Sequence, residues 1–212
     1  MSRFATTRFA PRRSAPKVKE GKVQRKNRWA PTRRGPLVRR EQPGRGHKHY
    51  ICKSDVLKFI DLLPQWEELS VGLNEIILAE AREFTQGWYR PGKVAICAWE
   101  KELLHEQYGC DFLDHEAVYR RLGIPFDHRE SIKYPNSDAY YVHYDNQSLR
   151  AYLLLHIFLH ELGHHHDLIT TKHQDDCARG ESYAEDYAIK YETLIFDRYC
   201  EAFDYHREPI AH

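Results

Sequence analysis

From residue 47 to the end of the chain, apolar residues recur at the spacings typical of helices and strands. Repeats every three or four residues, often behind a capping residue such as Ser54 or Asp114, predict helices. These helices cover residues 54–63, 100–108, 115–122, 146–167 and 180–203. Apolar runs or alternating patterns bounded by turn residues predict strands at residues 73–79, 93–98 and 138–145. The mixture predicts an α+β fold.

The first 46 residues follow no such pattern. They contain five prolines and fifteen Lys/Arg against Glu20 and Glu41, which gives a net charge of +13. A segment with so few aliphatic residues cannot bury enough apolar surface to offset its ordering entropy, so we expect a disordered basic arm over residues 1–46. Arginine pairs interleaved with aromatics, such as Trp29, favour contact with nucleic acid or a ribonucleoprotein. A solubilising tail without a dedicated partner is an equally open interpretation.

Residues 47–212 carry the opposite charge, with 17 Lys/Arg against 29 Asp/Glu and a balance of −12. No apolar run approaches the roughly 18 residues of a membrane span, so no membrane span is expected. The five cysteines include no C-x-x-C pair, which argues against a disulfide framework. We therefore expect a cytoplasmic protein with an arm at residues 1–46 and one folded domain at residues 47–212.

The predicted helix at residues 146–167 carries the motif H-E-x-x-H at His160, Glu161 and His164. Histidines one turn apart lie on one helix face, so both imidazoles can bind a single ion, while Glu161 points about 100° away, toward a metal-bound water. The residues before the motif are apolar nearly all round, which indicates a buried helix whose imidazoles need partners. The motif therefore predicts a metal site with Glu161 as general base.

The last predicted helix begins with two carboxylates on its small, apolar side, Glu181 and Glu185, separated by Ala184. Carboxylates in such a position are costly unless a cation or hydrogen-bond donors face them. One Zn²⁺ ion held by His160, His164 and Glu181, with an open fourth position, accounts for them. Glu185 would then accept a hydrogen bond from a ligand imidazole. The alternative, with Glu185 as the third ligand, stays open.

Other polar residues near the motif have weaker claims. His173 lies nine residues after His164, whereas the longer three-histidine motif needs a histidine six residues after it. The run His165, His166 and Asp167 could bind a second metal, although such runs more often end a helix in solvent. The sequence does not identify the donor that would stabilise an oxyanion. The candidates are Tyr141, His143, Tyr187 and His206.

The His160–His164 motif and the Glu181–Glu185 element together resemble the gluzincin metallopeptidases, the thermolysin-like class of zincins. In that family the first glutamate of the second motif ligates zinc, and an aspartate four residues later supports a ligand histidine; this chain has Glu185 there instead. The resemblance implies a compact zincin-like domain, with a small mixed sheet, an active-site helix and a glutamate-bearing C-terminal helix. It also implies that residues 138–145 form the edge strand that aligns an extended substrate.

The expected function is that of a soluble zinc-dependent metallopeptidase, which hydrolyses a protein or peptide substrate with Glu161 as general base. The alternative is a nucleic-acid or ribonucleoprotein binding protein whose metal site is structural or vestigial. Glu161 has no ligand role in such a site, so its presence favours catalysis.

Overall fold

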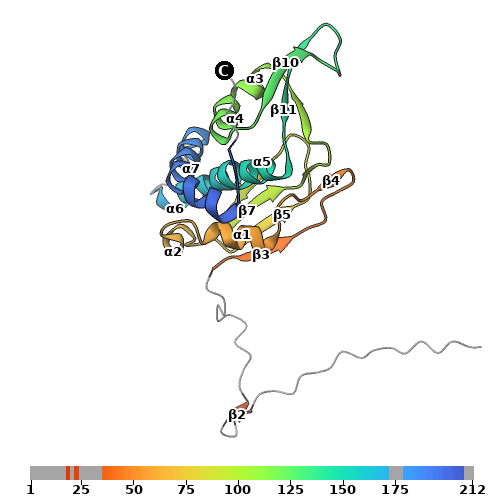
Figure 1. The fold of residues 1–212 in the computed structure, drawn as a ribbon. Coiled ribbons are helices and arrows are strands. Elements are labelled where there is room, and N and C mark those ends of the chain that lie inside the picture. Colours follow the sequence, from red (N-terminus) through yellow and green to blue (C-terminus); the bar gives the residue numbers. More distant parts are fainter. Residues whose placement is uncertain (1–17, 20–21, 24–34, 172–178, 208–212) are drawn as a thin grey trace, which may run out of the picture. The chain divides into compact units, whose positions relative to one another are not determined.

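The computed structural model describes residues 18–19, 22–23, 35–171 and 179–207 (Figure 1). The chain divides into two units, residues 1–34 and residues 35–212. In the first unit, β1 (Val18–Lys19) and β2 (Lys22–Val23) pair antiparallel. Most of the predicted basic arm therefore lies outside the described residues, but the disorder predicted for residues 35–46 is wrong, because this segment belongs to the folded unit.

The boundary predicted between residues 46 and 47 falls inside the folded unit and has to move. Strand β3 (Leu37–Arg40) pairs parallel with β5 (Glu75–Ala79), and its Val38 side chain is buried. This strand buries only one residue, Val38, and two arginines follow it. The basic charge pattern of the segment therefore masked the strand in the sequence. Residues 35–212 hold 20 Lys/Arg against 30 Asp/Glu, a balance of −10, and residues 1–34 hold 12 against Glu20, a balance of +11.

A mixed four-stranded sheet forms one layer of the folded unit. Its order is β3-β5-β7-β6, with β7 (Lys93–Cys97) parallel to β5 and β6 (Gly87–Arg90) antiparallel to β7. The predicted strands at residues 73–79 and 93–98 are thus confirmed as β5 and β7. Alternate residues point their side chains toward the helices, as the pleat requires. Across the sheet, these inward residues are Val38, Ile76, Leu78, Val94 and Ile96.

Two smaller sheets complete the strands, and they correct two predictions. β4 (His47–Lys48) pairs with β8 (Trp99–Glu100), and β10 (Phe126–Glu130), β11 (Asp138–His143) and β9 (Leu104–Gln107) form an antiparallel sheet in that order. The helix predicted at residues 100–108 is wrong, because β9 obtains its hydrogen bonds from the distant β11. The edge-strand role of residues 138–145 is wrong too, since β11 is the middle strand.

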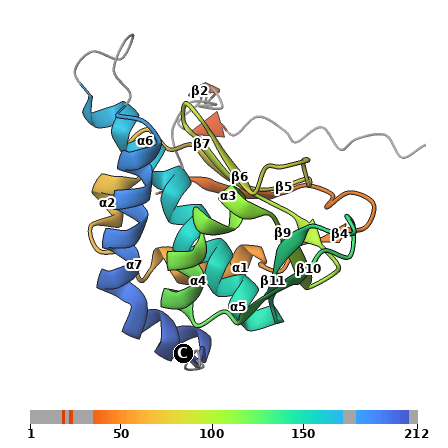
Figure 2. The same ribbon diagram turned by 90° about the horizontal axis from the view of Figure 1, so that it is seen from above.

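The helices are α1 (Lys53–Ile60), α2 (Trp66–Leu69), α3 (Gly109–Leu113), α4 (Glu116–Leu122), α5 (Asn146–Ala151), the π-helix η1 (Tyr152–Phe158), α6 (Leu159–Thr170) and α7 (Glu181–Phe203). Of the helices, α1, α6 and η1 contact the four-stranded sheet, while α7 packs on α6 and η1 and α3 lies beside β11 (Figures 1 and 2). The predicted long helix is the continuous run α5-η1-α6, and Asp145 caps it by accepting a hydrogen bond from Ser148 N at 2.6 Å. The observed class is therefore α+β, as predicted.

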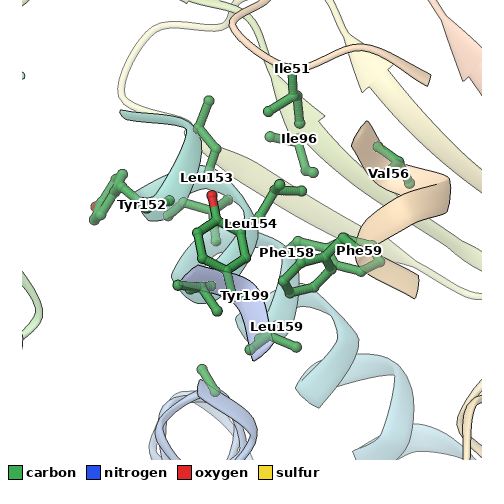
Figure 3. Packing of buried hydrophobic residues seen from close by; sticks show 14 of the residues in the cluster. Ile51, Val56, Phe59, Ile96, Tyr152, Leu153, Leu154, Phe158, Leu159 and Tyr199 are labelled. Atoms are coloured by element: carbon green, nitrogen blue, oxygen red, sulfur yellow. The ribbon is translucent and has the colours of Figure 1, made fainter. Parts of the chain in front are cut away.

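The core forms where η1 meets α1, α7 and the sheet (Figure 3). Phe59 of α1 packs edge-to-face on Phe158 and on Tyr199, with ring centroids 5.7 and 6.1 Å apart. Every residue of η1 is buried, which fixes the start of α6. Within the described residues, no helix is both long and apolar enough to cross a membrane.

Candidate metal centre

Helices α6 and α7 lie side by side, and two small residues let their backbones come close (Figure 2). A Cβ atom added to Gly163 would lie 2.8 Å from Ala184 Cα and 3.0 Å from the Ala184 carbonyl oxygen. The first distance is shorter than real Cβ contacts and the second is tighter than most, so a larger residue at position 163 would push the helices apart. The close approach brings the first turn of α7 against the histidines of α6.

Three predicted ligands meet at this contact. His160 Nε2 lies 3.1 Å from Glu181 Oε2 and 3.2 Å from His164 Nε2, and His164 Nε2 lies 3.4 Å from Glu181 Oε2. Ligand atoms bound tetrahedrally to zinc, at about 2.0–2.2 Å, lie roughly 3.3–3.6 Å from one another. Within the described part of the chain, this is the one group of His, Cys, Asp and Glu whose ligand atoms could hold a metal ion.

Glu185 lies on the other side of the His160 ring. Its Oε2 atom is 3.4 Å from His160 Nδ1 and 3.9 Å from Nδ1 of the buried His156. Burial lowers the pKa of His160, but the Glu185, Glu161 and Glu181 carboxylates outweigh it and raise that pKa above its ordinary value. The structure therefore groups Glu181 with the two histidines and leaves Glu185 facing the ring nitrogen that points away from them.

Glu161 is buried and stands apart from these three residues. Burial raises its pKa to about 7, with His160 acting against this rise and Glu181 adding to it. Its side chain packs against β6, where a Cβ atom on Gly87 would lie 2.8 Å from Glu161 Oε1. Glycine at this position lets the edge of the sheet reach the motif.

A cleft of about 590 Å³ opens over the cluster. One wall is the loop leading into β6, residues 84–87, and the other walls come from the ends of α4, η1 and α7. Among the described strands, β6 is the last of its sheet, and the face of β6 at Gly87 lies against Glu161. Strand β11, which includes most of residues 138–145, does not line the cleft.

The predicted oxyanion donors lie elsewhere in the described structure. Tyr141 donates to Glu106 at 3.0 Å, His143 lies 2.5 Å from Asp127, and neither lines the cleft. Tyr187 packs on Tyr191, and His206 lies 3.3 Å from Asp204; they do not line it either.

The cleft instead includes two imidazoles that the sequence did not assign to the site, His115 and His156, with ring centroids 5.8 Å apart. His115 Nδ1 lies 2.8 Å from the Asp111 carbonyl oxygen. The spacing of His156, one turn before His160, predicts that it lies on the same helix face as His160 and His164, and it lines the cleft beside His160. His115 is the residue just before α4, and no local pattern connects it to the motif.

The histidine run after the motif has structural partners. His165 Nε2 lies 2.9 Å from the Val71 carbonyl oxygen, and His166 Nδ1 lies 2.7 Å from Tyr183 OH. The buried Asp167 accepts hydrogen bonds from Arg179 Nε at 2.7 Å, Thr171 Oγ1 at 2.8 Å and Gly180 N at 3.3 Å. These bonds tie the residues just before α7 to the end of α6. His173 lies outside the described residues.

Searches against protein-family models, curated proteins and solved structures find no match to this chain.

Proposed function

We propose that this protein is a zinc-dependent metallopeptidase of the gluzincin type, with a zincin-like fold, that hydrolyses peptide bonds. The observation that carries the proposal is the convergence of His160, His164 and Glu181 beside a fourth residue, Glu161, that faces the same cleft without joining them. A structural zinc site uses four protein ligands, whereas a catalytic site uses three and keeps one position open.

The donor set fits zinc. Two imidazoles and one carboxylate are a common catalytic set, and burial lowers the pKa of His164, which favours the neutral form that binds metal. Two imidazole nitrogens and a carboxylate oxygen face one another there at 3.1–3.4 Å, and a cation between them would interact favourably with all three. When bound there, zinc would polarise a substrate carbonyl and lower the pKa of a bound water to about 7.

Glu161 would act as the general base of the reaction. Its pKa of about 7 suits a group that takes a proton from the attacking water and delivers it to the leaving amine at neutral pH. Its burial beside Gly87 holds the carboxylate at the edge of the cleft. Glu185, beside His160 Nδ1, would keep the ring proton on that nitrogen and leave Nε2 free to bind the metal.

The free edge of β6 supplies a place for an extended peptide. Unpaired backbone N–H and C=O groups on an edge strand can bind a peptide by adding it as a further strand. A peptide added to β6 would run along the cleft wall next to Glu161. This arrangement favours a peptide substrate over a small molecule.

The test is the Glu161→Gln variant of the full chain. It removes the base while keeping the shape of the side chain, so we expect near-stoichiometric zinc and an unchanged fold, with peptide hydrolysis reduced by about 10²–10⁴-fold. The exposed Glu201 on α7 gives the matched control, Glu201→Gln, which should cleave like the wild type. Hydrolysis that persists in Glu161→Gln would contradict the proposal.

The charge of residues 1–34 supports a second candidate function, binding of nucleic acid or a ribonucleoprotein with a structural or vestigial metal site. Twelve Lys/Arg stand there against Glu20 alone. This candidate predicts binding that weakens steeply as salt rises, and a shallower salt dependence when Arg12 and Arg13 are both replaced by Gln. If it were the sole function, the wild-type protein would hydrolyse no peptide.

A further inference from the structure

Phe84 occupies the mouth of the cleft and is 98% exposed. It belongs to the turn Arg82–Thr85, in which Thr85 N donates to the Arg82 carbonyl oxygen at 3.3 Å. The strand that follows, β6, passes directly over Glu161 through Gly87. The position of Phe84 is thus fixed by the same segment that forms the cleft wall.

The backbone at Phe84 makes this residue a poor choice for folding. Its φ angle is +55°, in the left-handed region, which favours glycine or asparagine and disfavours bulky side chains. Its exposed ring also buries almost no apolar surface in the folded unit. A residue that is unfavourable in both respects, at the lip of a cleft, is better explained by contact with a ligand than by stability.

The charge of the cleft restricts the chemical character of the ligand that Phe84 would contact. Four carboxylates line it, from Asp114, Glu161, Glu181 and Glu185, and no Lys or Arg is among the described residues of the lining. A divalent cation would offset only part of that charge. The cleft should therefore disfavour acidic side chains, and its apolar lining consists mainly of Phe84 and Ile157.

We propose that Phe84 is a specificity-determining residue, which contacts a large apolar side chain of the substrate peptide, and that the cleft carboxylates select against acidic residues beside it. This inference rests on the proposed peptidase function and names its substrate class. The preferred substrate is an extended peptide with a Phe- or Leu-like residue near the scissile bond and neutral or basic neighbours.

The experiment uses the zinc-loaded full chain and a peptide set in which Phe, Ala or Glu is moved through each position around one cleavable bond. For the wild type, we expect one position where kcat/KM for Phe exceeds that for Ala by about tenfold or more. Phe84→Gly should reduce this ratio to about two, and Phe84→Leu should retain most of it. Asp114→Asn should reduce the discrimination against Glu peptides.

Two measurements separate specificity from folding. Phe84→Gly should unfold at the same temperature as the wild type or higher, because glycine relieves the left-handed backbone. The control is Gln65→Gly, which changes another residue of positive φ (+57°) that does not line the cleft, and which should leave the Phe/Ala ratio unchanged.

The outcomes distinguish this inference from the proposed function. Equal Phe/Ala ratios in wild type and Phe84→Gly, with hydrolysis intact, would overturn the role of Phe84 and leave the peptidase standing. A wild-type protein that binds zinc and cleaves no member of the set would overturn both proposals.

Discussion

Two polar clusters connect α6 to α7, and they satisfy their carboxylates in different ways. Around Asp167, one buried carboxylate accepts hydrogen bonds from a guanidinium, a hydroxyl and a backbone N–H. Around His160, within two turns on the same helix, a carboxylate and two imidazoles direct ligand atoms at one another. The first cluster brings three donors to one carboxylate, whereas the second brings two imidazole nitrogens and a carboxylate oxygen within 3.4 Å of one another, the arrangement on which the proposed metal site rests.

The comparison distinguishes a structural polar cluster from the proposed metal site between α6 and the start of α7. Both contain a carboxylate, but Asp167 is bonded by a guanidinium, a hydroxyl and a backbone N–H, whereas Glu181 faces imidazoles. Exposure agrees with this division, since the Asp167 side chain is 2% exposed and that of Glu181 is 83% exposed. A side chain that has to reach a metal and a substrate must remain accessible.

The strongest test of the second cluster compares its two glutamates. Glu181→Ala removes one of three ligands, so we expect zinc binding to weaken by more than about 100-fold. Glu185→Ala removes only the group that orients His160, so we expect zinc affinity to fall by about 10–100-fold. Competition with a metal chelator measures both constants. If Glu185→Ala had the larger effect, the assignment of the third ligand would be reversed.

Substitution in the Asp167 cluster should lower the stability of the fold. Asp167→Ala leaves Arg179, Thr171 and the Gly180 amide without their shared acceptor. The Arg179 side chain is 44% exposed and can turn to water, so the expected loss is roughly 2 kcal/mol, less than for a fully buried pair. Denaturant unfolding measures it. The exposed Asp197 on α7 is the control, and Asp197→Ala should change stability by less than about 0.5 kcal/mol.

The contribution of Asp167 to stability should also depend on pH, and this effect is smaller. Burial acts to raise the pKa of Asp167, but the hydrogen bonds from Arg179, Thr171 and the backbone outweigh it, and its pKa lies below the ordinary value of 3.8. Asp167 therefore stabilises the fold above the pKa of the unfolded state and loses this contribution as pH falls through the lowered value. The stability difference between wild type and Asp167→Asn should shrink on acidification. If the stability difference stayed constant with pH, the pKa of Asp167 would not be lowered in the folded protein.

Sequence patterns predicted the elements whose signal is local. Helix α7 and the run α5-η1-α6 are long and periodic, and the motif spacing placed His160 and His164 on one face. The helix predicted at residues 100–108 was wrong because the strand there depends on pairing with β11, which lies more than thirty residues away in the sequence. The residues of the cleft walls could not be predicted for the same reason, since His115 and Gly87 reach the motif only through tertiary packing.

The tight contacts at Gly87, Gly163 and Ala184 have a consequence for evolution. At Gly87 and Gly163 an added Cβ atom would lie less than 3.0 Å from atoms of Glu161 or Ala184, so substitution there would move the site apart. Any distant relative that keeps this chemistry should keep small residues at these three points, even where the rest of its sequence has diverged. Three small residues combined with two histidines and two glutamates therefore form a search pattern that could identify such relatives.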